Sequence, residues 1–221
     1  MTDDKPTSVE IVAAVADGST RGAIAALIEP VNGFLGTLLG PATKELGGWA
    51  GDVVEFARWK WRVKMLKRAE GIIESAGLTA HDVPLQVLMP ILDSGANEDR
   101  PDMQERWANL LANAATMSGT VPAAFPEILR QLEPIEARAL DYMIAESGGW
   151  SGTARLLGHA MPGLDNANID NMVRLALVRF MAEDYTGPGA DIRYPEPALD
   201  STVLAARFVA ACLPPATSSA D

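Results

Sequence analysis

Residue types that commonly carry out chemistry are scarce and scattered in this chain of 221 residues. It contains two histidines, His81 and His159, which lie 78 positions apart, and a single cysteine, Cys212. One cysteine cannot form an internal disulfide, which fits a reducing compartment, and this set does not provide the ligands of a structural zinc site. Cys212 lies in an apolar run with helical spacing, which is typical of a small core residue.

Ser151 is the serine whose surroundings come closest to those of a nucleophile. It stands between Trp150 and Gly152, but it follows a helical pattern, whereas the nucleophile of a hydrolase elbow follows a strand. We interpret it as a helix N-cap. The sequence also lacks the HExxH, paired CxxC and P-loop motifs. We therefore expect a protein that is not an enzyme and has no cofactor, metal or small-molecule substrate.

The strongest functional signal is a basic strip over residues 58–68, in which six of eleven residues are Lys or Arg and two are Trp. On a helix, the lysines of this strip line one side, while Trp59 shares another side with Val63 and Leu66. The candidate interaction surface consists of Arg58, Trp59, Lys60, Trp61, Arg62, Lys64, Lys67 and Arg68.

Three interpretations of the basic strip remain open. A basic amphipathic helix beside an apolar segment can lie on an anionic membrane surface. It can also bind phosphate backbones while its tryptophans stack on bases. In the third interpretation, the tryptophans pack inward and the cations pair with the acidic remainder of a chain whose net charge is −11.

The segment 22–43 precedes this strip and carries a single charged residue, Glu29. Small residues recur four positions apart, a spacing that lets helices approach closely. The candidate helix-packing or oligomer contacts are Gly36, Gly40, Gly47 and Gly51. We expect tightly packed core helices or a self-association face, and the alternative is membrane contact. A span is disfavoured by Glu29, Pro30 and Asn32, which lipid tolerates poorly.

The charge distribution argues against broad electrostatic binding of nucleic acid. Before residue 118 there are 11 basic and 16 acidic residues (−5), and after it 7 and 13 (−6), so neither half is basic. The partner we expect is a protein or a second copy of the chain, with an anionic membrane surface as the alternative. The polar N-terminus is not a secretory signal. We expect a cytoplasmic protein, peripheral at the inner membrane in the membrane interpretation.

Apolar spacing predicts helices along most of the chain. The predicted helices are 8–16, 21–29, 31–39, 42–75 with Gly77 as its C-cap, 84–92 with an early end at Pro90, 101–117, 122–132, 134–147, 151–159, 168–180 and 200–213. The helix 101–117 has the clearest buried face, formed by Trp107, Leu110, Leu111, Ala114 and Ala115. We predict short strands within 178–185 and over 191–195.

This order predicts a mainly α protein in which an N-terminal multi-helix layer precedes a winged-helix-like α+β domain with a short β-hairpin. The predicted parts are a partly flexible segment 1–20, a helical domain 21–132, a winged-helix-like domain 133–213 and a disordered tail 214–221. The candidate recognition helix starts with Asp165 and Asp170, and the wing over 183–191 is acidic as well. Because phosphates would be repelled, we favour protein binding or packing for this domain.

Five segments of the chain resemble the abortive infection alpha family of bacteria, which is associated with phage defence. They are Gly40-Pro-Ala-Thr-Lys-Glu-Leu-Gly47, Phe56-Ala-Arg-Trp-Lys-Trp-Arg62, Val83-Pro-Leu-Gln-Val-Leu-Met-Pro-Ile-Leu92, Glu105-Arg-Trp-Ala-Asn-Leu-Leu-Ala-Asn-Ala114 and Phe125-Pro-Glu-Ile-Leu-Arg-Gln-Leu-Glu-Pro-Ile-Glu-Ala137. The resemblance implies a phage-defence context and no catalytic residues. We expect an abortive-infection protein that acts through protein or membrane interaction of its N-terminal helical region. The alternative is a winged-helix nucleic-acid-binding regulator.

Overall fold

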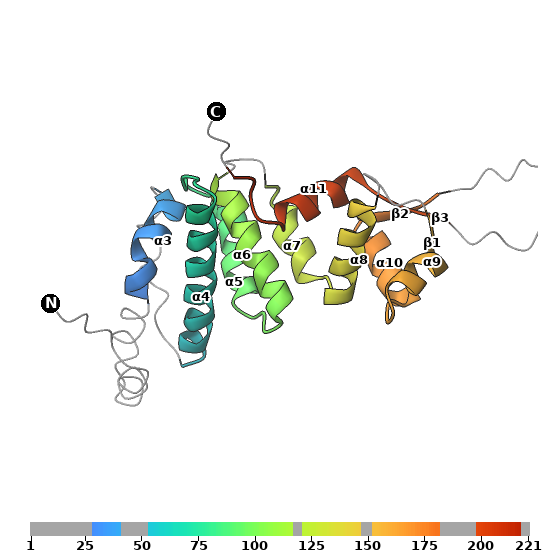
Figure 1. Ribbon diagram of the computed structural model, residues 1–221. Coiled ribbons are helices and arrows are strands. Elements are labelled where there is room, and N and C mark those ends of the chain that lie inside the picture. The colour runs from blue at the N-terminus through green and yellow to red at the C-terminus, as the bar shows by residue number, and fades with distance from the viewer. Residues whose placement is uncertain (1–27, 41–52, 117–120, 147–151, 182–197, 218–221) are drawn as a thin grey trace, which may run out of the picture. The chain divides into compact units, whose positions relative to one another are not determined.

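The computed structural model describes residues 28–40, 53–116, 121–146, 152–181 and 198–217, although only the backbone is described at 53–58, 152–156, 181 and 198. The chain divides into two compact units, one formed by 1–126 with 213–221 and the other by 127–212. Helices dominate the described residues of both units (Figure 1), so the predicted mainly helical class is confirmed.

The first unit is built from helices that lie side by side (Figure 1). They are η1 (Glu29–Val31), α3 (Asn32–Leu39), α4 (Val53–Ser75), α5 (Leu85–Gly95) and α6 (Pro101–Thr116). The helices α4, α5 and α6 pack against one another in all three pairs. The predicted apolar face of α6 is buried from Trp107 to Ala115, and Leu110 and Leu111 have no exposed surface. This face is the centre of the first unit's core.

The described part of the apolar segment 22–43 belongs to the same core. Phe34, Leu35, Leu38 and Leu39 on α3 are all buried. The backbone N–H of Val83 donates a hydrogen bond of 2.9 Å to the carbonyl of Leu38, which ties α3 to the segment before α5. Among the described helices, none is both long enough and apolar enough to cross a membrane.

The end of α4 and the continuation of α5 through a proline follow from local chemistry. Gly77 has a φ of +67° and ends α4 as predicted, with Leu78 N–H donating to the Ile73 carbonyl. The predicted early end at Pro90 is wrong, because α5 continues through it to Gly95. Proline removes one helical hydrogen bond, to the carbonyl of Gln86. Gln86 is exposed, so solvent can satisfy that carbonyl.

The second unit combines helices with a small antiparallel sheet. Its elements are α8 (Pro134–Ala145), β1 (Gly152–Thr153), α9 (Ala154–Ala160), α10 (Asn166–Arg174), β2 (Val178–Met181), β3 (Ala198–Ser201) and α11 (Val203–Ala211); α7 (Ala124–Arg130) contains the division between the units. The strand order is β1-β3-β2, and Phe180 on β2 pairs with Leu199 on β3.

Three predicted boundaries in this unit are wrong. The predicted helix 168–180 ends at Arg174, because Ala176 has a left-handed backbone with a φ of 57° and Val178 already pairs in the sheet. The helix 151–159 begins only after β1, and Asp200 belongs to β3 rather than to the last helix. In each case the cross-strand pairing, which local spacing does not reveal, decides the boundary. The predicted strand 191–195 lies outside the described residues.

The winged-helix interpretation stays a prediction. The described order of helix, strand, two helices, two strands and a closing helix contains every predicted element type and one additional strand, β1, while the predicted wing lies outside the described residues. Of the tail predicted as disordered, residues 214–217 are described with the first unit. Directly before these residues, the Leu213 carbonyl accepts a hydrogen bond of 2.7 Å from Asn113 Nδ2.

Candidate functional site

The outward side of α4 carries most of the basic strip. Lys60, Lys64, Lys67 and Arg68 are exposed, and 39% of the Trp61 surface is accessible. The spacing of these five residues places them on one side of the helix, since positions three, four and seven apart lie above one another. We call this set, Lys60, Trp61, Lys64, Lys67 and Arg68, the α4 face. The side chain of Arg58 lies outside the described part.

Two residues of the predicted surface are buried instead. Trp59 is 8% exposed and Arg62 is 5% exposed. Trp59, Val63 and Leu66 were predicted to share a helix side, and all three are buried. Trp59 and Arg62 therefore belong to the packing between helices, and among the residues whose side chains are described the candidate interaction surface is limited to the α4 face.

Arg62 fastens α4 to the C-terminal end of α5. Its Nε donates to the Leu92 carbonyl at 3.3 Å, and a terminal nitrogen forms an ion pair of 2.7 Å with Asp93. The guanidinium carbon also lies 5.1 Å from the centre of the Trp59 ring. A cation above an aromatic face is attracted by the negative charge of that face. The buried charge is thereby compensated on both sides.

The α4 face is joined to α6 by polar contacts. Lys64 lies over the Trp61 ring, with its Nζ 4.9 Å from the ring centre, and donates a hydrogen bond of 3.2 Å to Gln104 Oε1. Arg68 forms an ion pair with Glu105. These contacts hold the ends of two flexible side chains in place and leave them at the surface.

Gln104 is hydrogen-bonded to the backbone of Glu98, an acidic residue that is buried. Gln104 donates through Nε2 to the backbone carbonyl of Glu98, and the Glu98 carboxylate accepts hydrogen bonds from the Arg100 backbone and guanidinium at 2.7–3.0 Å. Burial acts to raise the pKa of Glu98, but the hydrogen bonds and charge of Arg100 outweigh it and hold that pKa below its usual range. The loop before α6 therefore contains a fixed negative charge.

A small pocket opens within the α4 face. Its volume is about 20 Å³, room for a group about the size of one water molecule. The lining residues are Trp61, Lys64, Met65, Arg68, Gly95 and Gln104. Among these residues Met65 is buried and Lys64 and Arg68 are exposed, and the surface of the pocket is mainly apolar.

The predicted glycine contacts are not brought together in the described residues. A side chain at Gly36 would meet no atom within 4 Å, so its position is open rather than closely packed. Gly40 has a φ of +49° and approaches Asp82. Gly47 and Gly51 lie outside the described residues.

Gly95 is the closely packed glycine that the sequence reasoning missed. A Cβ there would lie 2.6 Å from Met65 Sδ and 3.3 Å from Trp107. In the sequence, Asp93-Ser-Gly-Ala-Asn97 looks like an ordinary turn, and no local signal distinguishes this glycine from others.

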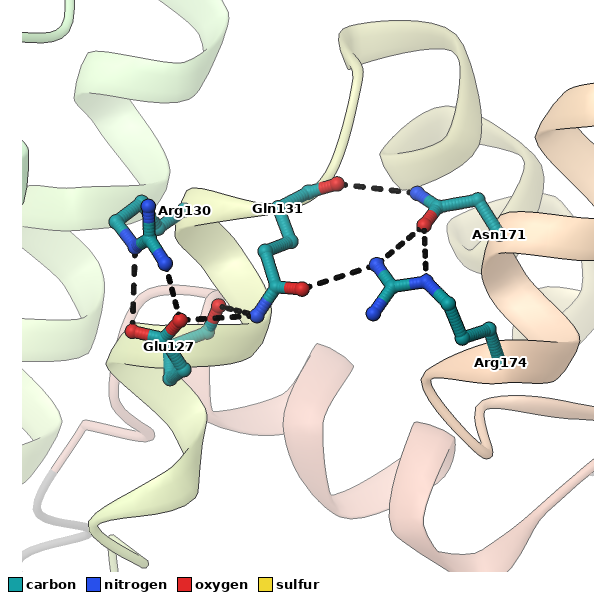
Figure 2. A network of polar contacts seen from close by, with 5 residues as sticks. All are labelled: Glu127, Arg130, Gln131, Asn171 and Arg174. Atoms are coloured by element: carbon teal, nitrogen blue, oxygen red, sulfur yellow. Dashed lines mark hydrogen bonds and ion pairs between the residues drawn. The ribbon is translucent and has the colours of Figure 1, made fainter.

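In the second unit, polar side chains of α10 contact Gln131, which directly follows α7 (Figure 2). Asn171 donates to the Gln131 carbonyl, and Arg174 donates to the side chains of Gln131 and Asn171 at 2.7–3.2 Å. Gln131 in turn donates to Glu127, which pairs with Arg130. The side chains of Asn171 and Arg174 on the candidate recognition helix therefore form hydrogen bonds within their own unit.

A buried carboxylate lies at the centre of this arrangement. Glu136 on α8 is 1% exposed and accepts hydrogen bonds from Asn168 and Asn171 at 3.1 and 2.9 Å. It also accepts from the Glu133 backbone at 2.9 Å, as part of the capping box that starts α8. What remains exposed on α10 includes Asp170, and Asp165 is exposed at the N-cap.

The scattered candidates for chemistry remain scattered. His81 and His159 are exposed, Cys212 is buried, and Ser151 lies outside the described residues. Within the described ranges, no three His, Cys, Asp or Glu side chains lie close enough to hold a metal ion together.

Together the fold and the site define a mainly helical protein of two units that presents a basic, tryptophan-bearing helix face. The family model described as abortive infection alpha matches residues 57–212, and the chain belongs to this family. Membership associates the protein with abortive infection. No curated protein and no solved structure matches the chain.

Proposed function

We propose that the protein is a non-enzymatic phage-defence protein that acts in abortive infection by binding a protein partner through the α4 face. The observation that carries this proposal is a local reversal of charge. The chain has a net charge of −11, yet Lys60, Lys64, Lys67 and Arg68 are exposed together around Trp61. Such a patch attracts an acidic surface, and Trp and Arg are enriched at protein-binding sites.

An anionic membrane surface is the alternative partner, and the packing of α4 favours it less. A helix that lies in a membrane interface needs a broad apolar side to bury in lipid. The apolar side of α4, including Trp59, Val63 and Leu66, is already buried in the protein. Trp61 alone is left as a large exposed apolar residue of the α4 face. A cytoplasmic location accords with a protein partner and is part of the proposal.

Nucleic-acid regulation through the second unit is the other alternative. The side chains of Asn171 and Arg174 are engaged within the unit, and Asp165 and Asp170 are exposed where phosphates would approach. This arrangement supports the alternative less than the α4 face supports protein binding.

A phage-protection assay in bacteria that express the protein tests the proposal. The double substitution Lys60→Glu and Lys67→Glu lowers the charge of the α4 face from +4 (three Lys and one Arg) to zero and leaves the Lys64–Gln104 and Arg68–Glu105 contacts in place. Arg207→Glu, at an exposed position of α11, is the control. We expect loss of protection for the double variant and full protection for the control, at equal protein levels.

Two further readouts separate the alternatives. Sedimentation with anionic vesicles that depends on Lys60 and Lys67 would favour the membrane. A gel shift with DNA at low salt that persists in the double variant would favour the second unit. Full protection by the double variant would overturn the proposed role of the α4 face.

A further inference from the structure

The pocket in the α4 face combines features that specify a ligand more narrowly than charge alone. Of its lining residues, Met65 and Gly95 are buried and form an apolar base, whereas Lys64 and Arg68 are exposed and form a cationic rim. Its volume of about 20 Å³ admits a group about the size of a methyl.

Arg68 at the rim already binds one carboxylate of the protein itself. Glu105 on α6 pairs with Arg68, and the two side chains are 37% and 51% exposed. Exposed ion pairs contribute little to stability, so such a pair exchanges readily with another carboxylate. Lys64, by contrast, contacts the neutral amide of Gln104 and the Trp61 ring. No carboxylate of the described residues pairs with its charge.

From this geometry we infer that the pocket binds an acidic segment of a partner protein, with a small apolar side chain such as Ala on Met65 and Gly95 and flanking carboxylates on Lys64 and Arg68. This inference rests on the proposed function and names the chemistry of the partner. A phospholipid headgroup fits less well, because it would bring phosphate to the rim but nothing to occupy the apolar base.

Glu105 acts in this proposal as an internal competitor. Its carboxylate occupies Arg68 in the free protein, so an arriving carboxylate must share or displace it. Removal of the Glu105 charge is then expected to strengthen binding, whereas removal of the Lys64 charge weakens it. Opposite effects of two neighbouring substitutions are not expected from a general loss of structure.

The test is methyl NMR of the full chain labelled at its methionines, titrated with the acetylated peptide amide Glu-Ala-Glu. We expect the Met65 methyl resonance to shift, and the dissociation constant to fall about fivefold in Glu105→Gln and to rise about fivefold in Lys64→Gln. The matched peptide Gln-Ala-Gln controls for charge, and Asp170→Asn, in the second unit, controls for a change of protein charge.

Three results would overturn the inference. One is an unchanged Met65 resonance with Glu-Ala-Glu in both wild type and Glu105→Gln. Another is equal binding of Gln-Ala-Gln. The third is a Met65 response to phosphatidylserine vesicles but not to the peptide. If the Lys60 and Lys67 double variant loses phage protection but the Met65 resonance does not respond to the peptide, the proposed function stands and this ligand is rejected. Failure of the inference and failure of the proposed function are therefore distinguishable.

Discussion

The Arg62 guanidinium on α4 lies 5.1 Å from the centre of the Trp59 ring and pairs at 2.7 Å with Asp93, which lies in the last turn of α5. One side chain thus connects the buried side of α4 to the end of a second helix. Six basic residues occur in this strip, and among those whose side chains are described Arg62 is the buried one.

Replacement of Arg62 by Ala is expected to lower the free energy of unfolding by about 1–3 kcal/mol, because the Leu92 carbonyl loses a buried donor and the Trp59 ring loses packing. Lys60→Ala, on the exposed side of α4, should change it by less than about 0.5 kcal/mol. Urea denaturation of both variants measures the difference. Equal effects would show that Arg62 does not fasten the two helices.

Substitution of the two tryptophans of the strip should affect stability and partner binding to different extents. Trp59→Ala removes a buried ring and is expected to cost about 3–5 kcal/mol of stability. Trp61→Ala removes a ring that is 39% exposed and should cost less than half as much. The expected effect of Trp61→Ala is instead on partner binding.

Thermal unfolding and acrylamide quenching of single-tryptophan variants distinguish these two positions. Emission from Trp61 should be quenched readily and emission from Trp59 poorly. Equal quenching of Trp59 and Trp61 in the folded protein would contradict the assignment of Trp61 to the α4 face.

Glu136 should stabilise the second unit through its acceptor oxygens. Glu136→Gln keeps the shape but turns one acceptor into a donor facing Asn168 or Asn171, so we expect a loss of about 1–3 kcal/mol. Glu146→Gln, at an exposed position, is the control. Hydrogen exchange at α8 and α10 reports the effect locally, and unchanged protection there would contradict the proposed link between these helices.

Acid should destabilise the first unit in part through Glu98. Its folded-state pKa lies below the ordinary value of 4.5 despite burial, because Arg100 favours the charged form. A depressed folded pKa contributes stability above the unfolded value, and that stability is lost as the pH falls through the folded pKa. The relevant window therefore begins near pH 4.5 and extends downward.

Unfolding curves recorded across that window for wild type and Glu98→Gln measure this contribution. The variant should be less stable than wild type at neutral pH, and the gap should narrow as the pH falls. A constant gap at every pH would mean that Glu98 acts through shape alone. Asp99→Asn, at the exposed neighbouring position, should follow the wild-type curve.

Local sequence features determined much of the helical framework. The spacing of Trp107, Leu110 and Leu111 predicted the buried side of α6, and Gly77 predicted the end of α4. These features act within a few residues of one another, through helix periodicity and backbone conformation, so they can be recognised without knowledge of the tertiary fold. The family resemblance is likewise contained in the order of residues, and the match over 57–212 confirms it.

The identity of the exposed cations was decided only by tertiary packing. Periodicity placed Trp59 and Trp61 on different sides of α4, but α5 and α6 determine which side is covered. Arg62 is buried because Leu92 and Asp93 lie beside it, and Gly95 and Gln104 reach the α4 face from segments far along the chain. The sequence by itself therefore determined that the strip is basic and helical. The tertiary structure decided which part of it is core and which is surface, because burial depends on contacts between residues distant in sequence.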